Sequence, residues 1–380
     1  MCGFAGPEVG TESQVLERMN QTIHHRGPDD SGMFFSRSLE PESGGPAAAL
    51  AMRRLAVIDL HAGHQPISNE DDSCWIVYNG EVYNYQEMRL ELEAAGHKFK
   101  TDTDTEVLLH AYEEYGVDCL GRFRGMFALA IWDEPRRRLL LARDHVGIKP
   151  LFYTTVDSTL VFGSEIKALL AYPGVPRKLN QEATSHFLTY LYAPAPATMF
   201  EGIHQLKPGH RLILQDGRQT VEEYWKGPSA WVEQAPAANL KDVSPEALWE
   251  VLSESVDSHL VSDVPVGAFL SGGIDSSAIV ALMAKHMNRK VKTFSIGFEG
   301  SGLYDESKFA QLMGDSVGSE HNVLHIDAAS VERLPQILRH IDEPMADASV
   351  IPNYFLAEMA RKQVTVVLSG IGGDELFGGY

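Results

Sequence analysis

The sequence predicts an α+β domain, a mostly antiparallel sheet with helices on its outer faces, followed by an α/β domain with a doubly wound parallel sheet. Up to about residue 170, short apolar strands alternate with turns, whereas from Pro245 onward helix and strand patterns alternate. A chain of 380 residues is long enough for two hydrophobic cores. Between them the sequence is rich in Ala, Pro and polar residues. We therefore expect one domain over residues 2–218, a linker over 219–245 and a second domain over 246–380.

Composition favours small-molecule partners. A formal net charge of −20 argues against nonspecific binding to nucleic acid and to anionic membranes. The amino end has no charged segment followed by an apolar one, and no apolar run approaches membrane-spanning length. Three cysteines form neither an even set nor a metal-binding spacing, which is typical of a reducing compartment. We expect a cytoplasmic protein.

In the first domain, apolar spacing predicts two helices, over residues 85–95 and 105–115. The strands expected there are 49–53, 75–78, 127–132, 138–142, 151–155 and 159–163. Asn79 and Gly80 follow the second strand and are expected to form a turn. Such a turn can place a side-chain amide beside a backbone N–H, and two neutral donors so placed form an oxyanion hole. An ordinary hairpin turn is the alternative for this dipeptide.

In the second domain, helical and strand patterns alternate, which favours a parallel sheet. The expected helices are 246–260, 307–317, 331–341 and 352–362, and the expected strands are 266–270, 291–298, 322–326 and 364–368. Ligands of such sheets bind at the carboxyl ends of the strands. Residues 271–277 and 369–375 each follow a strand, so we expect both segments to face one site.

Residues 271–277 read Ser-Gly-Gly-Ile-Asp-Ser-Ser, between an apolar strand and an apolar helix. The glycines allow a sharp bend, and the helix start offers unpaired N–H groups and a positive dipole end, so this loop suits an anion. Asp275 would repel a phosphate unless a divalent cation lay between them. The loop therefore indicates a nucleotide with Mg²⁺, and a serine-capped helix start is the alternative. Asp275 and Asp374 are the expected Mg²⁺ ligands.

The chain opens Met1-Cys2-Gly3, where a small residue follows the initiator Met. If Met1 is removed, Cys2 carries its own base. The free α-amine has a reference pKa of about 7.7 to 8.0 and the thiol about 8.5, so the amine can take the thiol proton near pH 7. Cys2 is thus a candidate nucleophile. Whether Met1 is removed does not follow from the sequence.

Further motifs follow Met1-Cys2-Gly3 in order: His25-Arg26-Gly27-Pro28-Asp29, Arg53 to Asp59, Tyr78 to Asn84, and Thr103 to Glu106. Up to about residue 170 the chain resembles the class II glutamine amidotransferases. With Ser271 to Ser277 included, nearly the whole chain resembles the glutamine-hydrolysing asparagine synthetases. The resemblance implies the four-layer αββα fold of amino-terminal nucleophile hydrolases for the first domain, and an ATP-pyrophosphatase fold for the second.

The resemblance also implies roles for particular residues. Cys2 would hydrolyse glutamine, with Asn79 and Gly80 as oxyanion donors. Arg54 would bind the α-carboxylate of glutamine, and Glu81 and Asp104 its α-ammonium. The second domain would use ATP and Mg²⁺ to adenylate a carboxylate, most simply that of aspartate. The expected ATP and pyrophosphate contacts are Ser271, Gly272, Gly273, Asp275, Ser276, Ser277, Ile296, Ser369 and Gly370.

Ile371 departs from the family pattern, because synthetases of this family commonly carry an acid there. The acceptor therefore stays open between aspartate and another carboxylate, for example an envelope or polysaccharide precursor. A glutaminase or nucleotide-binding module without ligase activity is a further alternative. Family members continue beyond the position of Tyr380, so we expect a fragment of a longer protein. The resemblance leaves a homodimer open and does not fix how the two sites communicate.

Overall fold

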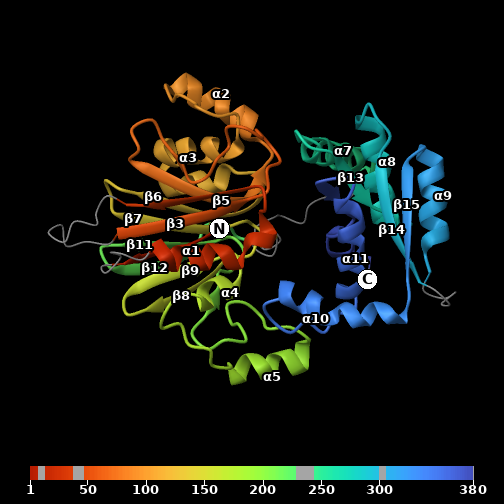
Figure 1. Cartoon of the computed structure of the whole chain (residues 1–380). Coiled ribbons are helices and arrows are strands. Elements are labelled where there is room, and N and C mark those ends of the chain that lie inside the picture. Colours follow the sequence, from red (N-terminus) through yellow and green to blue (C-terminus); the bar gives the residue numbers. More distant parts are fainter. Residues whose placement is uncertain (7–12, 37–46, 228–243, 299–304, 380) are drawn as a thin grey trace. The chain divides into compact units, whose positions relative to one another are not determined.

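The computed structural model describes residues 1–6, 13–36, 47–227, 244–298 and 305–379. Most of the expected linker, residues 228–243, and the terminal Tyr380 lie outside these described residues. The chain forms two compact units (Figure 1), Met1–Ala237 with Asp342–Met345, and Ala238–Ile341 with Ala346–Tyr380. In the described part of the chain, no helix combines the length and apolarity needed to cross a membrane.

The first unit contains two six-stranded antiparallel sheets. The first sheet has the order β10 (His204–Gln205), β8 (Phe152–Val156), β9 (Thr159–Gly163), β1 (Cys2–Gly6), β3 (Ala47–Arg54), β2 (Asp30–Phe35). The second has the order β12 (Arg218–Glu223), β11 (His210–Gln215), β7 (Arg138–Arg143), β6 (Gly125–Asp133), β5 (Cys74–Val82), β4 (Ile67–Ser68). Strand β1 is central in its sheet, so the amino terminus is fixed on both sides by β3 and β9.

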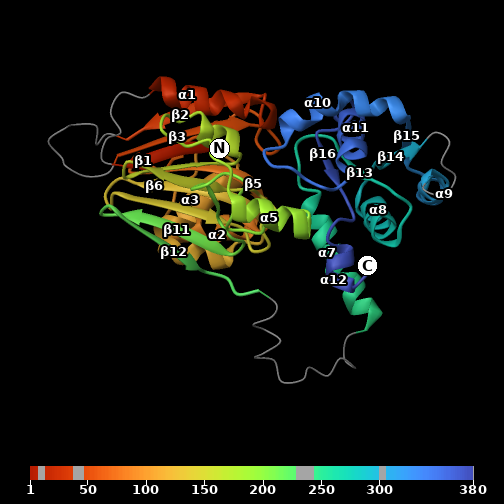
Figure 2. The same ribbon diagram turned by 90° about the horizontal axis from the view of Figure 1, so that it is seen from below.

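Helices cover the outer faces of both sheets, as Figures 1 and 2 show. The helices of this unit are α1 (Ser13–Thr22), α2 (Tyr85–Ala95), α3 (Asp104–Tyr115), α4 (Ile166–Leu170) and α5 (Gln181–Tyr190), with the 3-10 segments η1 (His24–Arg26) and η3 (Gly116–Arg122). One core cluster joins α2 and α3 to the second sheet, and another joins α1 and α4 to the first. A third cluster, around Leu50 and Trp132, lies between the sheets. This αββα layering confirms the fold expected for the first domain.

The second unit contains a four-stranded parallel sheet in the order β15 (Glu320–Ile326), β14 (Lys292–Phe298), β13 (Val266–Phe269), β16 (Val366–Leu368). Its helices are α7 (Pro245–His259), α8 (Ile274–His286), α9 (Ser307–Val317), α10 (Leu334–Ile337), α11 (Val350–Arg361) and α12 (Gly373–Phe377), with η5 (Ala328–Arg333) and η6 (Leu338–His340). Side chains of α7, α8 and α9 share one cluster with the sheet, and those of α11 share another. Helices therefore cover both faces, which confirms the doubly wound fold (Figure 2).

The turn expected at Asn79-Gly80 is wrong. Both residues lie inside β5 and pair with Ala128 and Phe127 of β6. A Cβ on Gly80 would lie 2.2 Å from the carbonyl oxygen of Met126. The glycine therefore permits two strands to approach closely, which is the second common use of glycine within a sheet.

The continuous helix expected over residues 331–341 is also wrong. The segment divides into η5, α10 and η6, three consecutive short helices. Pro335 lies in the first turn of α10, where its ring tolerates a helix start but supplies no N–H to continue the preceding turn. Proline thus accounts for the break between the first two pieces.

Candidate functional site

Cys2 begins the central strand of the first sheet and lies between Ala51 of β3 and Gly163 of β9. Its side chain is fully buried and packs in the cluster between this sheet and its helices. Burial raises the pKa of the Cys2 thiol to about 12, although the terminal amine and Arg53 oppose the shift. A thiol with this pKa is almost entirely protonated near pH 7 and a poor nucleophile.

Met1 precedes Cys2 in this structure and carries the terminal amine. The amine donates to Ser164 Oγ at 3.2 Å, and the Ser164 N–H donates to the Met1 carbonyl oxygen at 2.9 Å. Burial lowers the pKa of this amine to about 5. The Met1 side chain belongs to the core cluster between the two sheets, which also contains Val77 of β5 and Ala128 of β6.

Asn79 has a donor without an acceptor. Among the described residues, its Nδ2 is buried from solvent and has no hydrogen-bond partner. A buried amide N–H left unpaired costs about 1–3 kcal/mol, so such groups are uncommon unless a ligand completes them. Gly80 follows directly on the same strand. The site thus holds a fixed neutral donor, although not in the turn that the sequence predicts.

Arg54 is the last residue of β3 and is mostly buried. Its Nη2 donates to the carbonyl oxygens of Ile58 at 2.8 Å and Asp59 at 2.7 Å. A Cβ on Gly63 would lie 2.1 Å from the same nitrogen, so only glycine fits beside it. These contacts hold the guanidinium in one orientation.

Asp104 and Glu81 form a pair of carboxylates, of which the first is buried and the second half-buried. Asp104 begins α3, and its Oδ2 accepts from the Tyr78 hydroxyl at 2.8 Å and from the Val82 N–H at 3.0 Å. Burial raises the pKa of Asp104. Burial and the charge of Asp104 raise the pKa of Glu81 well above its usual value, while Lys149 and Arg54 act in the opposite direction. The structure therefore brings Arg54, Glu81 and Asp104 into one electrostatic neighbourhood.

Residues 271–277 form a tight turn after β13 and the first turn of α8, which begins at Ile274. Ser271 Oγ accepts from the Gly273 N–H at 3.2 Å and lies 3.0 Å from Ser276 Oγ. Gly272 has φ 87°, and a Cβ there would lie 2.5 Å from the Ala310 nitrogen. Gly273 caps α8 without a side chain, so no side-chain oxygen takes up the first N–H groups of the helix. The loop therefore keeps the anion-binding character that the sequence predicts.

The loop after β16 packs against this first loop, since β16 is the parallel neighbour of β13. A Cβ on Gly370 would lie 2.7 Å from the Ser276 nitrogen, and one on Gly373 would lie 2.4 Å from Asp275 Oδ2. Asp374 is the next residue along, in the first turn of α12. The two segments thus share the carboxyl edge of the sheet, and Asp275 and Asp374 lie on adjoining parts of it.

The remaining expected nucleotide contacts lie nearby in the fold. Ile296 is half-buried on β14, opposite Leu324 of β15, and Ser277 donates its N–H to the Gly273 carbonyl at 3.0 Å inside α8. Ser369 directly follows β16 and is half-buried. Ile371 is 88% exposed at the tip of the second loop.

Sequence reasoning assigned no role to Glu165, whose carboxylate organises the surroundings of the amino terminus. Its Oε1 lies 2.9 Å from His25 Nε2 and from Arg26 Nη1, and its Oε2 lies 2.6 Å from Lys167 Nζ. His25 and Arg26 belong to the motif His25 to Asp29, so this motif was the sequence feature that could have indicated their partner Glu165. Burial also lowers the pKa of Lys149.

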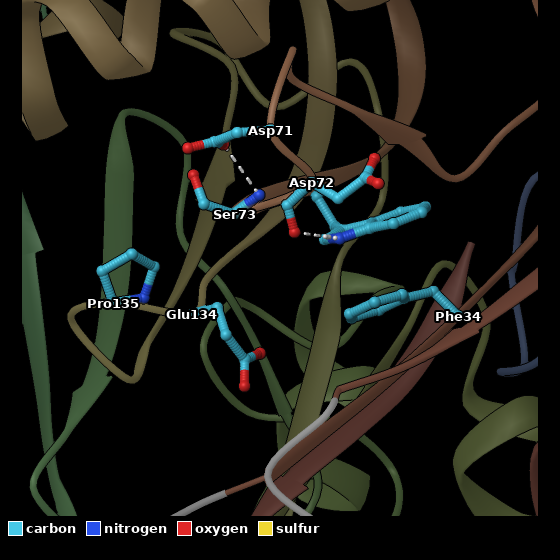
Figure 3. Close-up of a pocket in the computed structure, with 7 residues that line it drawn as sticks. Phe34, Asp71, Asp72, Ser73, Glu134 and Pro135 are labelled. Atoms are coloured by element: carbon cyan, nitrogen blue, oxygen red, sulfur yellow. Dashed lines mark hydrogen bonds between the residues drawn. The ribbon is translucent and has the colours of Figure 1, made fainter.

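A separate pocket of about 240 Å³ lies outside these sites (Figure 3). It is lined by Phe34, Asp71, Asp72, Ser73, Trp75, Glu134 and Pro135. Phe34 stacks on Trp75 with ring centroids 4.3 Å apart, and the Trp75 indole N–H donates to the Asp72 carbonyl at 3.0 Å. None of the residues expected to bind glutamine or ATP lines this pocket.

Comparison with known proteins places both domains in families. Residues 1–225 match a glutamine amidotransferase domain model, and residues 247–380 match an asparagine synthase model. Asparagine synthetase [glutamine-hydrolyzing] 1 of Bacillus subtilis is 40% identical over all of this chain, which spans 59% of that relative's length. Putative asparagine synthetase [glutamine-hydrolyzing] 2 of Methanocaldococcus jannaschii is 36% identical, and this chain spans 76% of its length.

A relative with another name also matches. The protein named Amidase chry2 of Gibberella zeae is 33% identical over 98% of this chain, which covers 56% of that relative. The two family models match in this order along the chain. The chain belongs to the family of glutamine-hydrolysing asparagine synthetases.

Proposed function

We propose that the first domain, residues 2–218, hydrolyses glutamine with Cys2 as nucleophile. The observation that carries this proposal is the buried Asn79 Nδ2, which has no acceptor among the described residues. A donor fixed on a strand and held away from water is what a developing oxyanion requires, because it needs no reorganisation during the reaction. Gly80 supplies the adjacent backbone N–H.

After removal of Met1, the α-amine of Cys2 takes the thiol proton, and Sγ attacks the side-chain amide carbon of glutamine. The carbonyl oxygen becomes an oxyanion facing Asn79 and Gly80. Collapse of this intermediate forms a thioester, and the amine returns the proton to the departing ammonia. Water then hydrolyses the thioester to glutamate and regenerates the thiol.

The two ends of the glutamine backbone are assigned to Arg54 and to the carboxylates of Glu81 and Asp104. Arg54 presents a planar guanidinium suited to a carboxylate. Asp104 is buried, Glu81 is half-buried near it, and the charge of each carboxylate raises the free energy of ionising the other. A substrate α-ammonium between them would offset that repulsion. Free glutamine, which carries both charges, is the expected substrate.

The second domain, residues 246–380, is proposed to activate a carboxylate with ATP. Residues 271–277 offer backbone N–H groups, and Ser271, Ser276 and Ser277 offer hydroxyls, to the phosphates. Asp275 in the first turn of α8 and Asp374 in the first turn of α12 lie on adjoining segments and fit a site for Mg²⁺, which would neutralise the phosphate charge when bound. The acceptor carboxylate attacks the α-phosphate and pyrophosphate leaves. Ammonia then attacks the adenylate and AMP leaves, forming the amide.

Aspartate is the proposed acceptor, and asparagine the product. Residues 219–245 are proposed as the linker between the two catalytic domains. The three cysteines are free, which suits the reducing cytoplasm. Glutamine, ATP and aspartate are the proposed partners, with no nucleic acid or membrane, and a homodimer is the proposed assembly.

One observation favours a second candidate, an amidotransferase for a different carboxylate. Ile371 is 88% exposed where asparagine synthetases commonly carry an acid. An apolar residue there cannot position or deprotonate ammonia. The relative named Amidase chry2 is consistent with other substrates in related chains.

The test uses the full-length protein with glutamine, ATP, Mg²⁺ and a panel of acids that includes aspartate. AMP, pyrophosphate and new amide are measured together. Equimolar AMP, pyrophosphate and asparagine support the proposal. The same stoichiometry with another acid alone supports the second candidate. Glutamate and ammonia without AMP would reduce the protein to a glutaminase.

A further inference from the structure

Two histidines and two glutamates meet at one side of α3, and none of them is a residue proposed for the glutamine or ATP site. Glu70, His97, His110 and Glu113 each present one ligand atom, and these atoms lie within 4.8 Å of one another. His110 and Glu113 are on α3, His97 is in the segment after α2, and Glu70 is in the segment between β4 and β5. From these contacts we propose that this cluster, the α3 cluster, binds one Zn²⁺ ion.

The donor set has the chemistry of a zinc site. Zn²⁺ takes imidazole nitrogen and carboxylate oxygen in tetrahedral geometry, whereas Mg²⁺ and Ca²⁺ prefer oxygen ligands throughout. In the structure, Glu113 Oε2 lies 2.7 Å from His110 Nδ1 and 4.0 Å from His97 Nδ1. Glu70 lies 3.7 Å from the Nδ1 atom of each histidine, through Oε2 to His110 and Oε1 to His97. Bonds of about 2.0–2.1 Å to a tetrahedral ion separate its ligands by about 3.3 Å, so only small movements are needed.

The carboxylates are held in place by protein donors. Glu113 Oε1 accepts from Asn69 Nδ2 at 2.5 Å, which leaves Oε2 toward the histidines. Glu70 Oε1 accepts from the Lys98 N–H at 2.9 Å. Asn69 Oδ1 in turn accepts from the Ser73 and Cys74 N–H groups, at 2.9 and 3.0 Å. The ligands are therefore positioned by a second layer of hydrogen bonds.

Both imidazoles also face a carboxylate on their other side. His110 Nε2 lies 3.6 Å from Glu106 Oε1, and His97 Nε2 lies 3.6 Å from Glu114 Oε2. The arrangement of carboxylate, histidine and metal is common in zinc proteins, where the outer carboxylate fixes the tautomer and the ring orientation. His110 has no exposed surface, and its Nε2 has no hydrogen-bond partner within the described residues. Each Nδ1 is thereby assigned to the ion.

Charge supports a cation at this place. Four carboxylates, of Glu70, Glu106, Glu113 and Glu114, surround the two rings. A divalent ion between the two rings would balance part of this negative charge.

The ion would connect three segments close to the proposed glutamine site. Asp104 begins α3 one turn and a half before His110. Asp102, five residues after His97, donates its N–H to Asp59 Oδ2, and the Asp59 carbonyl holds Arg54. The role assigned to the ion is therefore structural, to order residues 97–102. The proposal does not depend on the proposed function, because its test measures metal content.

Untagged protein is stripped with chelator, equilibrated with Zn²⁺, desalted and assayed for bound metal. About one equivalent per chain is expected, with slower hydrogen exchange over residues 97–102 and a raised Tm. His97→Gln and Glu70→Gln should each abolish retention of the ion. Glu114→Gln, at an exposed outer carboxylate, should weaken Zn²⁺ about 10- to 100-fold. Co²⁺ in place of Zn²⁺ should show the visible absorption of a tetrahedral nitrogen and oxygen site.

Two control variants make the result specific. His204→Gln removes an exposed histidine on β10 and should leave Zn²⁺ binding unchanged. Cys2→Ala removes a buried thiol outside the α3 cluster and should also leave Zn²⁺ binding unchanged. The proposal is overturned if the wild-type chain retains no zinc. It is equally overturned if folded His97→Gln and Glu70→Gln variants, checked by circular dichroism, bind zinc as the wild type does.

Discussion

Gly373 lies against the carboxylate of Asp275, so closely that a Cβ on the glycine would come within 2.4 Å of Asp275 Oδ2. The contact joins the loops that follow β13 and β16, which are parallel neighbours in the sheet. The geometry is within one unit and does not depend on how the two units are arranged. A substitution at Gly373 therefore tests whether the two segments form one nucleotide site.

Gly373→Ala should displace Asp275 and impair adenylation. A misplacement of about 1 Å at a reacting centre can cost about 10²-fold in rate. The added methyl should also lower the free energy of unfolding of the second domain by about 1–3 kcal/mol. ATP–pyrophosphate exchange and thermal unfolding measure the two effects. Gly121→Ala is the matched control, because its Cβ would meet nothing within 4 Å; equal activity in both variants would separate Gly373 from the ATP site.

Cys2→Ala should abolish glutamine hydrolysis in the full-length protein and leave synthesis from free ammonia intact. The reason is that the two reactions are assigned to separate domains, and alanine removes only the nucleophile. Glutamate release and AMP formation are measured with glutamine and then with ammonium chloride. Glutaminase activity that survives in this variant would rule out Cys2 as the nucleophile.

Asn79→Ala and Asp104→Asn should affect different kinetic constants. Loss of an oxyanion donor acts on the transition state, so Asn79→Ala should lower kcat for glutamine by about 10²- to 10³-fold. Asp104 is assigned to the α-ammonium, a contact made equally in both states, so Asp104→Asn should chiefly raise KM. Arg54→Lys should behave like Asp104→Asn because it loses the planar fork. The opposite pattern would mean that the binding and catalytic roles are exchanged.

Local patterns predicted the elements that depend on local spacing. Helices 85–95 and 307–317 and strand 159–163 have the predicted bounds, because apolar periodicity and flanking turns define them. The predicted turn at Asn79-Gly80 was wrong because the sequence does not distinguish a glycine in a strand from a glycine in a turn. What distinguishes them is the Met126 carbonyl oxygen of another strand, 2.2 Å from the would-be Cβ.

The α3 cluster could not be predicted from the sequence for a related reason. Of its members Glu70, His97, His110 and Glu113, only the last two have a recognisable spacing. The fold brings the other two from separate segments. The contacts of Glu165 with His25 and Arg26 were missed because these residues are far apart in the sequence, and only the fold brings them together.

Glu165 should make the stability of the first domain depend on acid pH. Burial raises the pKa of Glu165, but hydrogen bonds from His25, Lys167 and Arg26 outweigh it and lower the pKa from 4.5 to about 2. A folded pKa below the unfolded one means that the stabilisation is complete above about pH 4.5 and is lost as the pH falls toward 2. Glu165→Gln lacks this contribution.

The measurement is urea unfolding of wild type and Glu165→Gln over this pH range. Their difference in free energy of unfolding should be about 1–3 kcal/mol near neutral pH, as expected for hydrogen bonds to a charged group, and should shrink below pH 4.5. Glu182→Gln, at an exposed carboxylate on α5, is the control and should show no such trend. A difference that is constant with pH would mean that the ion pairs contribute nothing.

Removal of Met1 should convert Cys2 from an inert thiol to a reactive one. With Met1 attached, Cys2 is buried, its pKa is raised to about 12, and its own nitrogen is an amide. At pH 8 the thiolate fraction would be about 10⁻⁴, and alkylation should rise about tenfold per pH unit. Without Met1, the freed α-amine of Cys2 supplies a base beside the thiol, so alkylation at pH 8 should be faster and should level off at lower pH.

Iodoacetamide labelling, followed by intact mass, separates chains with and without Met1 in one sample. Burial also raises the pKa of the Cys74 and Cys119 thiols to about 12, so both should stay unlabelled in both forms. Cys2→Ala gives the background. Glutaminase activity should track the fraction of chains without Met1, and equal labelling and activity in the two forms would show that the amino terminus of Cys2 takes no part in catalysis.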